Sequence, residues 1–172
     1  MPLSTSTQTV TSTLDLDEVV RLTIGYVHSS WNIEAASLWW LDEAKDILRV
    51  LANVGTPLEI LNRVEVPLGE GFVGHVAQTG RWVYTNDAPS HPLHYRDVDF
   101  RTGFKTQSLL CVPLLFGGKV VGAMQLLNKQ NSDFDDQDVE KALSLAAAVA
   151  TAVSNALRFG EIAAEKDGAS IE

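Results

Sequence analysis

The sequence has little cysteine and little positive charge. Cys111 is its only cysteine, which excludes a disulfide framework and any cysteine-rich zinc site. Its 13 Lys and Arg residues stand against 22 Asp and Glu residues, so the formal net charge is -9. Binding to nucleic acid or to an anionic membrane depends on a basic surface, and this balance argues against both partners.

Long apolar runs are also lacking. The longest, from Ala142 to Val153, is shorter than the ~20 residues that span a bilayer, and Ser144 and Thr151 interrupt it. Residues 1–13 have neither the basic nor the apolar region of a signal peptide, and we interpret them as a flexible tail. We therefore expect a soluble, cytoplasmic protein, and 172 residues suit a single domain.

Hydrophobic periodicity predicts a mixed α/β chain, with helices at both ends and strands between them. The expected elements are a helix at 16–31, strands at 35–41, 47–54 and 64–67, a short helix at 72–78, a strand at 82–85, an irregular segment at 86–107, a hairpin of 108–116 and 119–128, and a helix at 136–159. Asp135 is expected to cap the last helix, Phe134 and Val139 to form a hydrophobic staple, and Gly160 to end it.

The hairpin indicates how the layers are arranged, since Gly117 and Gly118 mark a tight turn between two apolar strands. Alternation divides the second strand between two faces, with Val121, Ala123 and Leu127 on one and Val120, Met124 and Leu126 on the other. Both faces are apolar, so both must be covered. This pattern favours a three-layer α/β fold with an antiparallel sheet.

The last helix carries two apolar stripes instead of one. They consist of Val139, Leu143, Ala146, Ala150, Val153 and Leu157, and of Ala142, Leu145, Val149, Ala152, Ala156 and Phe159. Together they are too wide for a single contact with a sheet. We predict that one stripe covers the sheet and the other packs against a helix of a second copy, which gives a homodimer. The alternative is a helix that is buried on both sides within a monomer.

No group of residues indicates catalysis. Gly69, Gly71 and Gly74 match G-x-G-x-x-G, but a dinucleotide site needs a parallel βαβ unit with a longer helix. We interpret these glycines as the start of a short helix whose free N–H groups suit an anion. His75, His91 and His94 lack the spacing of metal ligands. No nucleophile motif is present either, so we predict neither a metal site nor an enzyme.

Residues 14–160 resemble a GAF domain in the order of their elements. The stretch HPLHYRDVDFRTGFKT, followed by LLCVPL, is similar to the cyclic-nucleotide-binding GAF domains of phosphodiesterases and cyanobacterial adenylyl cyclases. The family's N-K…F-x3-D-E motif is matched by Asn128, Lys129, Phe134 and Asp138, with Val139 in place of its Glu. Within that motif we expect a Lys129–Asp138 contact to anchor the last helix to the last strand.

The resemblance implies a six-stranded antiparallel sheet with the terminal helices on one face and a ligand pocket on the other. Residues 161–172 would be a polar tail or a truncated connector helix. Carried over by position, the ligand-binding residues would be Ser37, Asn53, Phe72, Val73, Tyr95, Asp99, Thr102, Thr106 and Gln125. The expected ligand is cyclic AMP, cyclic GMP or a similar small anion, with no other cofactor. Closure of Asn86–Gln107 over the ligand would be the switch.

Two departures from the family's pattern leave affinity and base choice open. Gln125 stands in place of a Glu, and Asn53 in place of a frequent Asp. One alternative is a GAF fold that serves dimerisation and signal transfer, with a degenerate pocket or one for an unknown ligand. A chromophore or haem sensor is another, although no Cys lies between Asn86 and Gln107 to hold a bilin. The sequence does not identify an output domain.

Overall fold

The structure, a computed structural model, describes residues 16–55, 64–94 and 104–171, with side chains between residues 18 and 157 of these ranges. The predicted tail at 1–13 lies outside the described residues. In chain order the elements are α2 (Leu16–Ser30), β1 (Ile33–Asp42), β2 (Ile47–Val54), β3 (Glu65–Pro67), α4 (Gly71–Thr79), β4 (Val83–Thr85), the short helix η1 (Ala88–Ser90), β5 (Leu109–Phe116), β6 (Lys119–Lys129) and α6 (Asp136–Ile171). Each predicted helix and strand is present, with bounds that shift by at most a few residues except at the end of α6.

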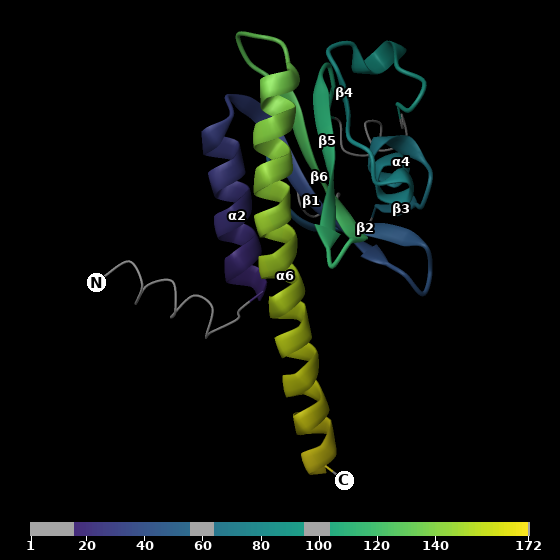
Figure 1. Ribbon diagram of the computed structural model, residues 1–172, viewed down its shortest axis with the longest axis vertical. Helices are drawn as coiled ribbons and strands as arrows, with labels where there is room; N and C mark the ends of the chain where they lie inside the picture. The colour runs from purple at the N-terminus through teal and green to yellow at the C-terminus, as the bar shows by residue number, and fades with distance from the viewer. Residues whose placement is uncertain (1–15, 56–63, 95–103, 172) are drawn as a thin grey trace, which may run out of the picture.

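The strands of the described ranges form one six-stranded sheet in the order β3-β2-β1-β6-β5-β4. Every neighbouring pair in it is antiparallel. Helices α2 and α6 lie side by side on one face of the sheet, which we call the α6 face (Figure 1). The opposite face is covered by α4 and is called the α4 face. The predicted three-layer fold is therefore confirmed.

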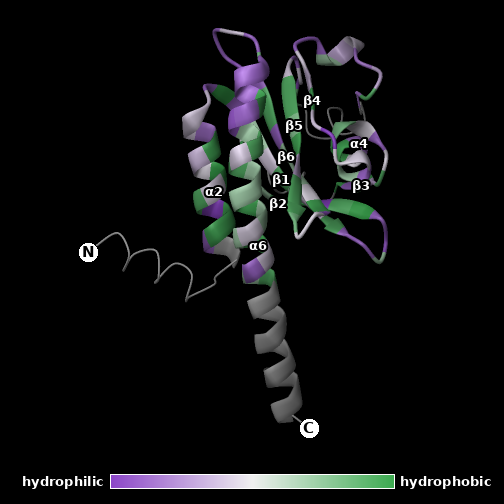
Figure 2. Ribbon diagram, in the orientation of Figure 1, coloured by the Kyte–Doolittle hydropathy of each residue, from purple (hydrophilic) through white to green (hydrophobic). Residues whose placement is uncertain are grey.

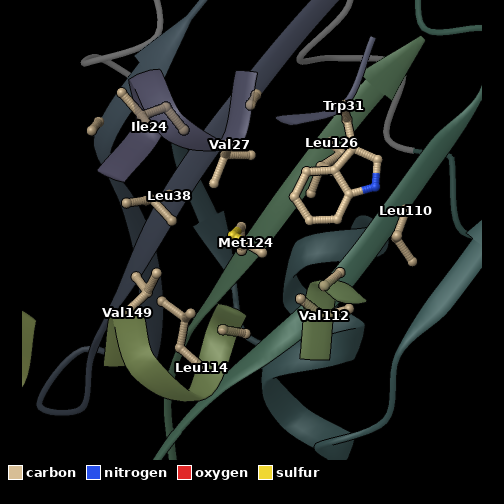
Figure 3. Packing of buried hydrophobic residues seen from close by; sticks show 14 of the residues in the cluster. Ile24, Val27, Trp31, Leu38, Leu110, Val112, Leu114, Met124, Leu126 and Val149 are labelled. Carbon is tan, nitrogen blue, oxygen red and sulfur yellow. The ribbon is translucent and has the colours of Figure 1, made fainter. Parts of the chain in front are cut away.

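Each face of the sheet has its own hydrophobic core. The core on the α6 face gathers side chains from α2, α6 and the central strands, among them Ile24, Val27, Leu38, Met124 and Val149 (Figure 3). The core on the α4 face includes Trp39, Leu48, Phe72, Val76 and Leu109. Strand β5 is largely hydrophobic (Figure 2) and is buried from Leu109 to Leu114, where its apolar residues alternate between the two cores. This explains why the hairpin has no polar face.

A β-bulge in β6 corrects the predicted faces of that strand. Leu114 pairs with Gly122, but the next residue, Leu115, pairs with Val120, so Val121 has no residue opposite it. An extra residue reverses the alternation on one side of the bulge. As a result Val121 packs on the α6 face and Val120 on the α4 face, the reverse of the prediction from strict alternation.

The start of α6 follows the predicted capping pattern. The Asp138 N–H donates to Asp135 Oδ1 at 3.0 Å, and the Asp135 N–H donates to Asp138 Oδ2 at the same distance. This reciprocal pair satisfies two N–H groups that the helix itself leaves without a carbonyl. Phe134 and Val139 are both buried in the core of the α6 face, as the predicted staple requires.

The end of α6 differs from the prediction, because the helix passes through Gly160 and continues to Ile171. Glycine permits a left-handed helix end but does not impose one, and inside a helix it costs only about 1 kcal/mol relative to alanine. No proline follows Gly160, and Ala, Glu and Lys in the next residues favour helix. The last part of α6 extends past the sheet, as Figure 1 shows.

The two stripes of α6 are mostly covered within one chain. In the second stripe Ala142, Val149 and Ala156 are buried, whereas Ala152 is exposed. Helix α6 contacts both β5 and α2, so a helix of the same chain takes the place that was assigned to a second copy. The stripes alone therefore do not require a dimer, and dimerisation stays a prediction.

Candidate ligand-binding site

Three of the predicted site residues form a row across the α4 face. Asn53 pairs with Ser37, and Ser37 pairs on its other side with Gln125. Directly paired residues of antiparallel strands lie about 5 Å apart and point to the same face. The row continues to Cys111, which pairs with Gln125 and packs in the core of the α4 face. Tertiary pairing thus joins polar groups from β2, β1 and β6.

Ser37 is the centre of this row and is itself buried. Its Oγ accepts a hydrogen bond from Trp39 Nε1 at 2.8 Å. A hydroxyl has one donor and two acceptor positions, so this bond leaves the Ser37 O–H able to donate to a third group. The contact with Trp39 was not predictable from the sequence, because two residues on one strand face meet only when their side chains adopt rotamers that point toward each other.

The start of α4 supplies backbone donors on the same side of the sheet. Its N-cap residue, Glu70, makes no side-chain capping bond. The first N–H groups of a helix have no carbonyl one turn before them, and here they belong to Gly71, Phe72 and Val73. The side chains of Phe72 and Val73 are buried in the core of the α4 face. These two predicted residues can therefore offer their backbone N–H groups, the arrangement that suits an anion.

The glycines of the G-x-G-x-x-G match act through close packing. A Cβ on Gly74 would lie 2.5 Å from the Pro67 carbonyl oxygen, so only glycine lets α4 approach β3 this closely. The Gly69 N–H also donates to the Gly74 carbonyl at 2.9 Å. Since every strand pair in the described residues is antiparallel, no βαβ unit accompanies the match.

The irregular segment is described at its two ends. The Ala88 N–H donates to the Gln107 carbonyl at 2.8 Å, which holds the ends together. Thr106 is buried close to this bond. The ring of His91 lies 4.9 Å from that of Phe72, so the start of the segment packs on α4. The predicted site residues Tyr95, Asp99 and Thr102 lie outside the described residues.

Asn128 holds the far end of that segment against the sheet. Its Oδ1 accepts from the N–H groups of Gln107 and Ser108, at 2.7 and 3.1 Å. Its Nδ2 donates to Glu34 Oε2 and to the Lys105 carbonyl, at 3.0 and 2.9 Å. Asn128 is buried and has a φ of 58°, a backbone conformation that asparagine adopts more readily than most residues.

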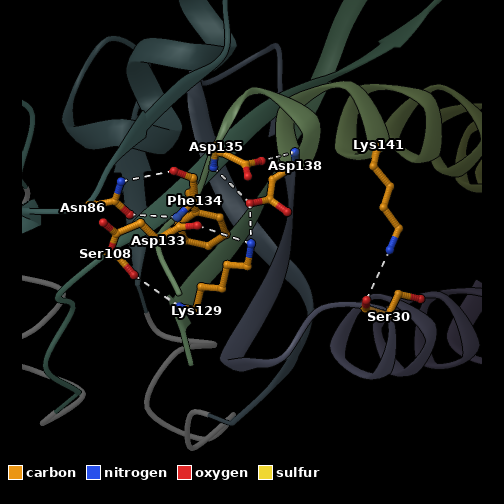
Figure 4. A network of polar contacts seen from close by, with 9 residues as sticks. All are labelled: Ser30, Asn86, Ser108, Lys129, Asp133, Phe134, Asp135, Asp138 and Lys141. Atoms are coloured by element: carbon orange, nitrogen blue, oxygen red, sulfur yellow. Dashed lines mark hydrogen bonds and ion pairs between the residues drawn. The ribbon is translucent and has the colours of Figure 1, made fainter. Parts of the chain in front are cut away.

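The rest of the motif fixes the start of α6, as Figure 4 shows. Lys129 Nζ lies 2.7 Å from Asp138 Oδ2 and 3.3 Å from the Asp133 carbonyl. The predicted anchoring contact between Lys129 and Asp138 is therefore confirmed. Both side chains lie on the α6 side of the sheet end, so this part of the motif is structural.

Asn86, which was not among the predicted residues, links the irregular segment to the start of α6. Its Nδ2 donates to the Phe134 carbonyl at 3.2 Å, and its Oδ1 accepts from the Phe134 N–H at 2.9 Å (Figure 4). The contact joins the first residue of the irregular segment to the residue before the α6 cap. A polar residue directly after a strand was the available signal, but the partner is 48 positions away in the chain.

Cys111 is a free, buried cysteine in the core of the α4 face. Burial raises the pKa of the Cys111 thiol, so it stays protonated and behaves as a small apolar group. Within the described ranges, no three His, Cys, Asp or Glu side chains lie close enough together to hold a metal ion. Among the helices of these ranges, none is long and apolar enough to cross a membrane.

Comparison with known proteins places these features in a family. The chain is 29% identical over 134 residues to a probable 3',5'-cyclic phosphodiesterase of Caenorhabditis elegans, covering 73% of this chain and 18% of that protein. It is 36% identical over 78 residues to the cGMP-specific 3',5'-cyclic phosphodiesterase of Drosophila melanogaster, covering 44% of this chain and 7% of that protein. The chain thus spans less than a fifth of either relative.

The fold itself has close counterparts among solved structures. The GAF domain of a phosphoenolpyruvate-protein phosphotransferase from Coxiella burnetii superposes with a TM-score of 0.75 at 19% identity, over 90% of this chain and 94% of that one. The model of the GAF domain family matches residues 13–154, which is most of the chain and includes the row on the α4 face. Because this match covers most of the chain, the chain belongs to the GAF domain family.

Proposed function

We propose that this chain binds a cyclic nucleotide, or a similar small anion, on the α4 face and passes the change to its terminal helices. GAF domains are regulatory modules that sense small molecules, and the two relatives named above are phosphodiesterases of cyclic nucleotides. The observation that carries the proposal is the row of Asn53, Ser37 and Gln125 on the face of the sheet that the start of α4 covers.

The chemistry of a cyclic nucleotide matches these two features. Its base has an edge of donors and acceptors, and Asn and Gln amides offer both kinds of group. Its cyclic phosphate carries one negative charge, which the N–H groups at the start of α4 can accept as hydrogen-bond donors. In this proposal the chain binds the ligand and has no catalytic role.

Isothermal titration calorimetry with cyclic AMP and with cyclic GMP tests the proposal. We expect one of them to bind at micromolar concentration, and Asn53→Ala or Gln125→Ala to weaken it about tenfold, the effect of losing 1.4 kcal/mol. Asn155→Ala, on the exposed side of α6, is the matched control and should bind as the unchanged chain does. No heat from either nucleotide at high micromolar concentration would refute the proposal.

A second candidate function is dimerisation and signal transfer without a ligand. It is favoured by the core of the α4 face, where Trp39, Phe72, Val73 and Val76 are buried together. If these side chains fill the space that a ligand would take, both nucleotides give no heat, and the chain still assembles. A nucleotide that binds with the expected loss in Asn53→Ala would dismiss this candidate.

We also propose that α2 and α6 mediate homodimerisation of this chain in the cytoplasm. Leu22 and Tyr26 lie one turn apart on α2 and are 52% and 58% exposed, which is unusual for large apolar side chains. Light scattering should show a dimer at micromolar concentration, and Leu22→Glu with Tyr26→Glu should give a monomer. Leu115→Glu, at an exposed leucine of β5, is the control and should leave the dimer intact.

A further inference from the structure

The two faces of the sheet have separate cores, so a change on one face needs a physical connection to reach the other. One such connection runs around the edge of the sheet at β4. Tyr84 packs against the core of the α6 face, and Ala88, four residues later, is fully buried in the core of the α4 face. The chain between Tyr84 and Ala88 therefore connects the core of the α6 face to the core of the α4 face.

Two side chains of this stretch hold the start of α6. The Tyr84 hydroxyl donates to Asp136 Oδ1 at 3.2 Å, in the first turn of the helix. Asn86 makes two hydrogen bonds with the backbone of Phe134, whose side chain is buried in the core of the α6 face. Asn86 fixes the start of α6 more firmly than Tyr84 does, because an amide that bonds both an N–H and a C=O fixes the position and the orientation of the backbone together.

The same stretch is tied to the α4 face by its backbone. The Ala88 N–H bonds to the Gln107 carbonyl, and the Gln107 N–H in turn bonds to Asn128 Oδ1. A displacement of Ala88 or Gln107 would therefore change the position of Asn86, only two residues from Ala88. Because Phe134 directly precedes the α6 cap, that displacement reaches the helix start within a few bonds.

We propose that Asn86 is a positioning residue that couples the α4 face to the start of α6. The inference rests on the proposed ligand site, since a bound ligand is what would displace Ala88 and Gln107. Asn86 itself touches no ligand in this proposal. Its role is to make the position of Phe134, and so the first turn of α6, depend on the state of the α4 face.

Amide NMR of the 15N-labelled full chain tests this with cyclic GMP and cyclic AMP as probes. In the unchanged chain we expect the nucleotide to shift the amide resonances of Phe72 and Val73 and also those between Phe134 and Val139. Asn86→Ala should keep the shifts at Phe72 and Val73, with an affinity within about threefold, and lose more than half of the shifts at α6. Asn86→Asp keeps the acceptor but not the donor and should give an intermediate loss.

Gln137→Ala is the control, because Gln137 is exposed in the first turn of α6 and should not alter the response. Shifts at α6 that are as large in Asn86→Ala as in the unchanged chain would overturn the inference. So would nucleotide binding that leaves Phe134 to Val139 unaffected in the unchanged chain, because then nothing is coupled.

A version of the experiment without ligand separates this inference from the proposed function. If neither nucleotide binds, the proposed function fails, and coupling is measured in the opposite direction. Asp138→Asn, which weakens the start of α6, should shift the Ala88 amide resonance in a chain with Asn86. In a chain with Asn86→Ala that shift should fall by more than half, and an equal shift in both chains would overturn the inference.

Discussion

Lys129 Nζ and Asp138 Oδ2 lie 2.7 Å apart across the loop that joins β6 to α6, and their side chains are only 16% and 12% exposed. Asp138 also accepts the Asp135 N–H, so one carboxylate serves an ion pair and a helix cap together. Because this carboxylate is mostly buried, the stability of the folded chain depends strongly on both of its partners.

Replacing Lys129 with methionine should therefore destabilise the chain by about 2 to 4 kcal/mol, because the mostly buried Asp138 carboxylate would lose its cation. Urea unfolding followed by circular dichroism measures this change. Lys119→Met removes an ion pair with Glu43 whose side chains are more than half exposed, and its cost should stay under about 1 kcal/mol. Equal costs for the two variants would contradict the prediction.

Asn128 should be sensitive to loss of its side chain and of its backbone freedom separately. Asn128→Ala removes four hydrogen bonds and strains a backbone with φ of 58°, whereas Asn128→Gly removes the same bonds without that strain. We expect both to destabilise the chain, and alanine to be worse by about 1 kcal/mol. Equal unfolding free energies for the two variants would show that the backbone is not strained there.

Tyr84 should ionise at a higher pH than an ordinary tyrosine. The negative charge of Asp136 raises its pKa above 10.0, with burial and their hydrogen bond as further causes. The folded chain thus holds this proton more tightly than the unfolded chain, so the contribution to stability is present below about pH 10 and lost as the pH rises through the folded pKa. Titration of tyrosinate absorbance, compared with Tyr84→Phe, isolates this group. Asp136→Asn should lower its pKa, and an unchanged midpoint would rule out the charge as the cause.

Two glycines should respond in opposite directions to alanine. A Cβ on Gly122 would collide with the Trp39 carbonyl oxygen of the neighbouring strand, and we expect a loss of about 2 to 3 kcal/mol. Gly25 is exposed within α2 with nothing near its Cβ position, so Gly25→Ala should stabilise the chain by about 0.5 to 1 kcal/mol. Thermal unfolding of both variants checks this, and a stable Gly122→Ala would mean that β1 and β6 can separate locally.

Cys111 is a built-in probe of the α4 face. The thiol is buried and its pKa is raised by that burial, so alkylation by iodoacetamide should be much slower in the folded chain than in urea. A ligand on the α4 face should slow the alkylation further, because Cys111 pairs with the predicted ligand-binding residue Gln125. Rapid alkylation of the folded chain would show that this face opens readily.

The order of helices and strands and the cap of α6 were predictable because they depend on local patterns. The strand-like run from Ile47 to Val54 predicted the bounds of β2, and the predicted cap Asp135 accepts the Asp138 N–H. Two predictions were wrong, for different reasons. The bulge at Val121 follows from how β5 and β6 fit together, which alternation along one strand does not show. The passage of α6 through Gly160 depends on the helix-forming residues beyond that glycine.

The candidate site shows the same division. Its residue types were carried over from a family resemblance, but only the sheet register places Asn53, Ser37 and Gln125 side by side. Asn86 could not be found from sequence, since its partner is the distant backbone of Phe134.

The sequence by itself thus determined a chain with one cysteine, a net charge of -9 and an apolar pattern that requires a sheet covered on both faces. Hydrophobic periodicity is a local property, so it can be recognised from the sequence alone. Tertiary structure alone decided which polar residues meet, that α2 of the same chain packs against α6, and how the two faces of the sheet are joined at β4. Those outcomes depend on contacts between residues far apart in the chain, whose geometry is set only when the layers pack.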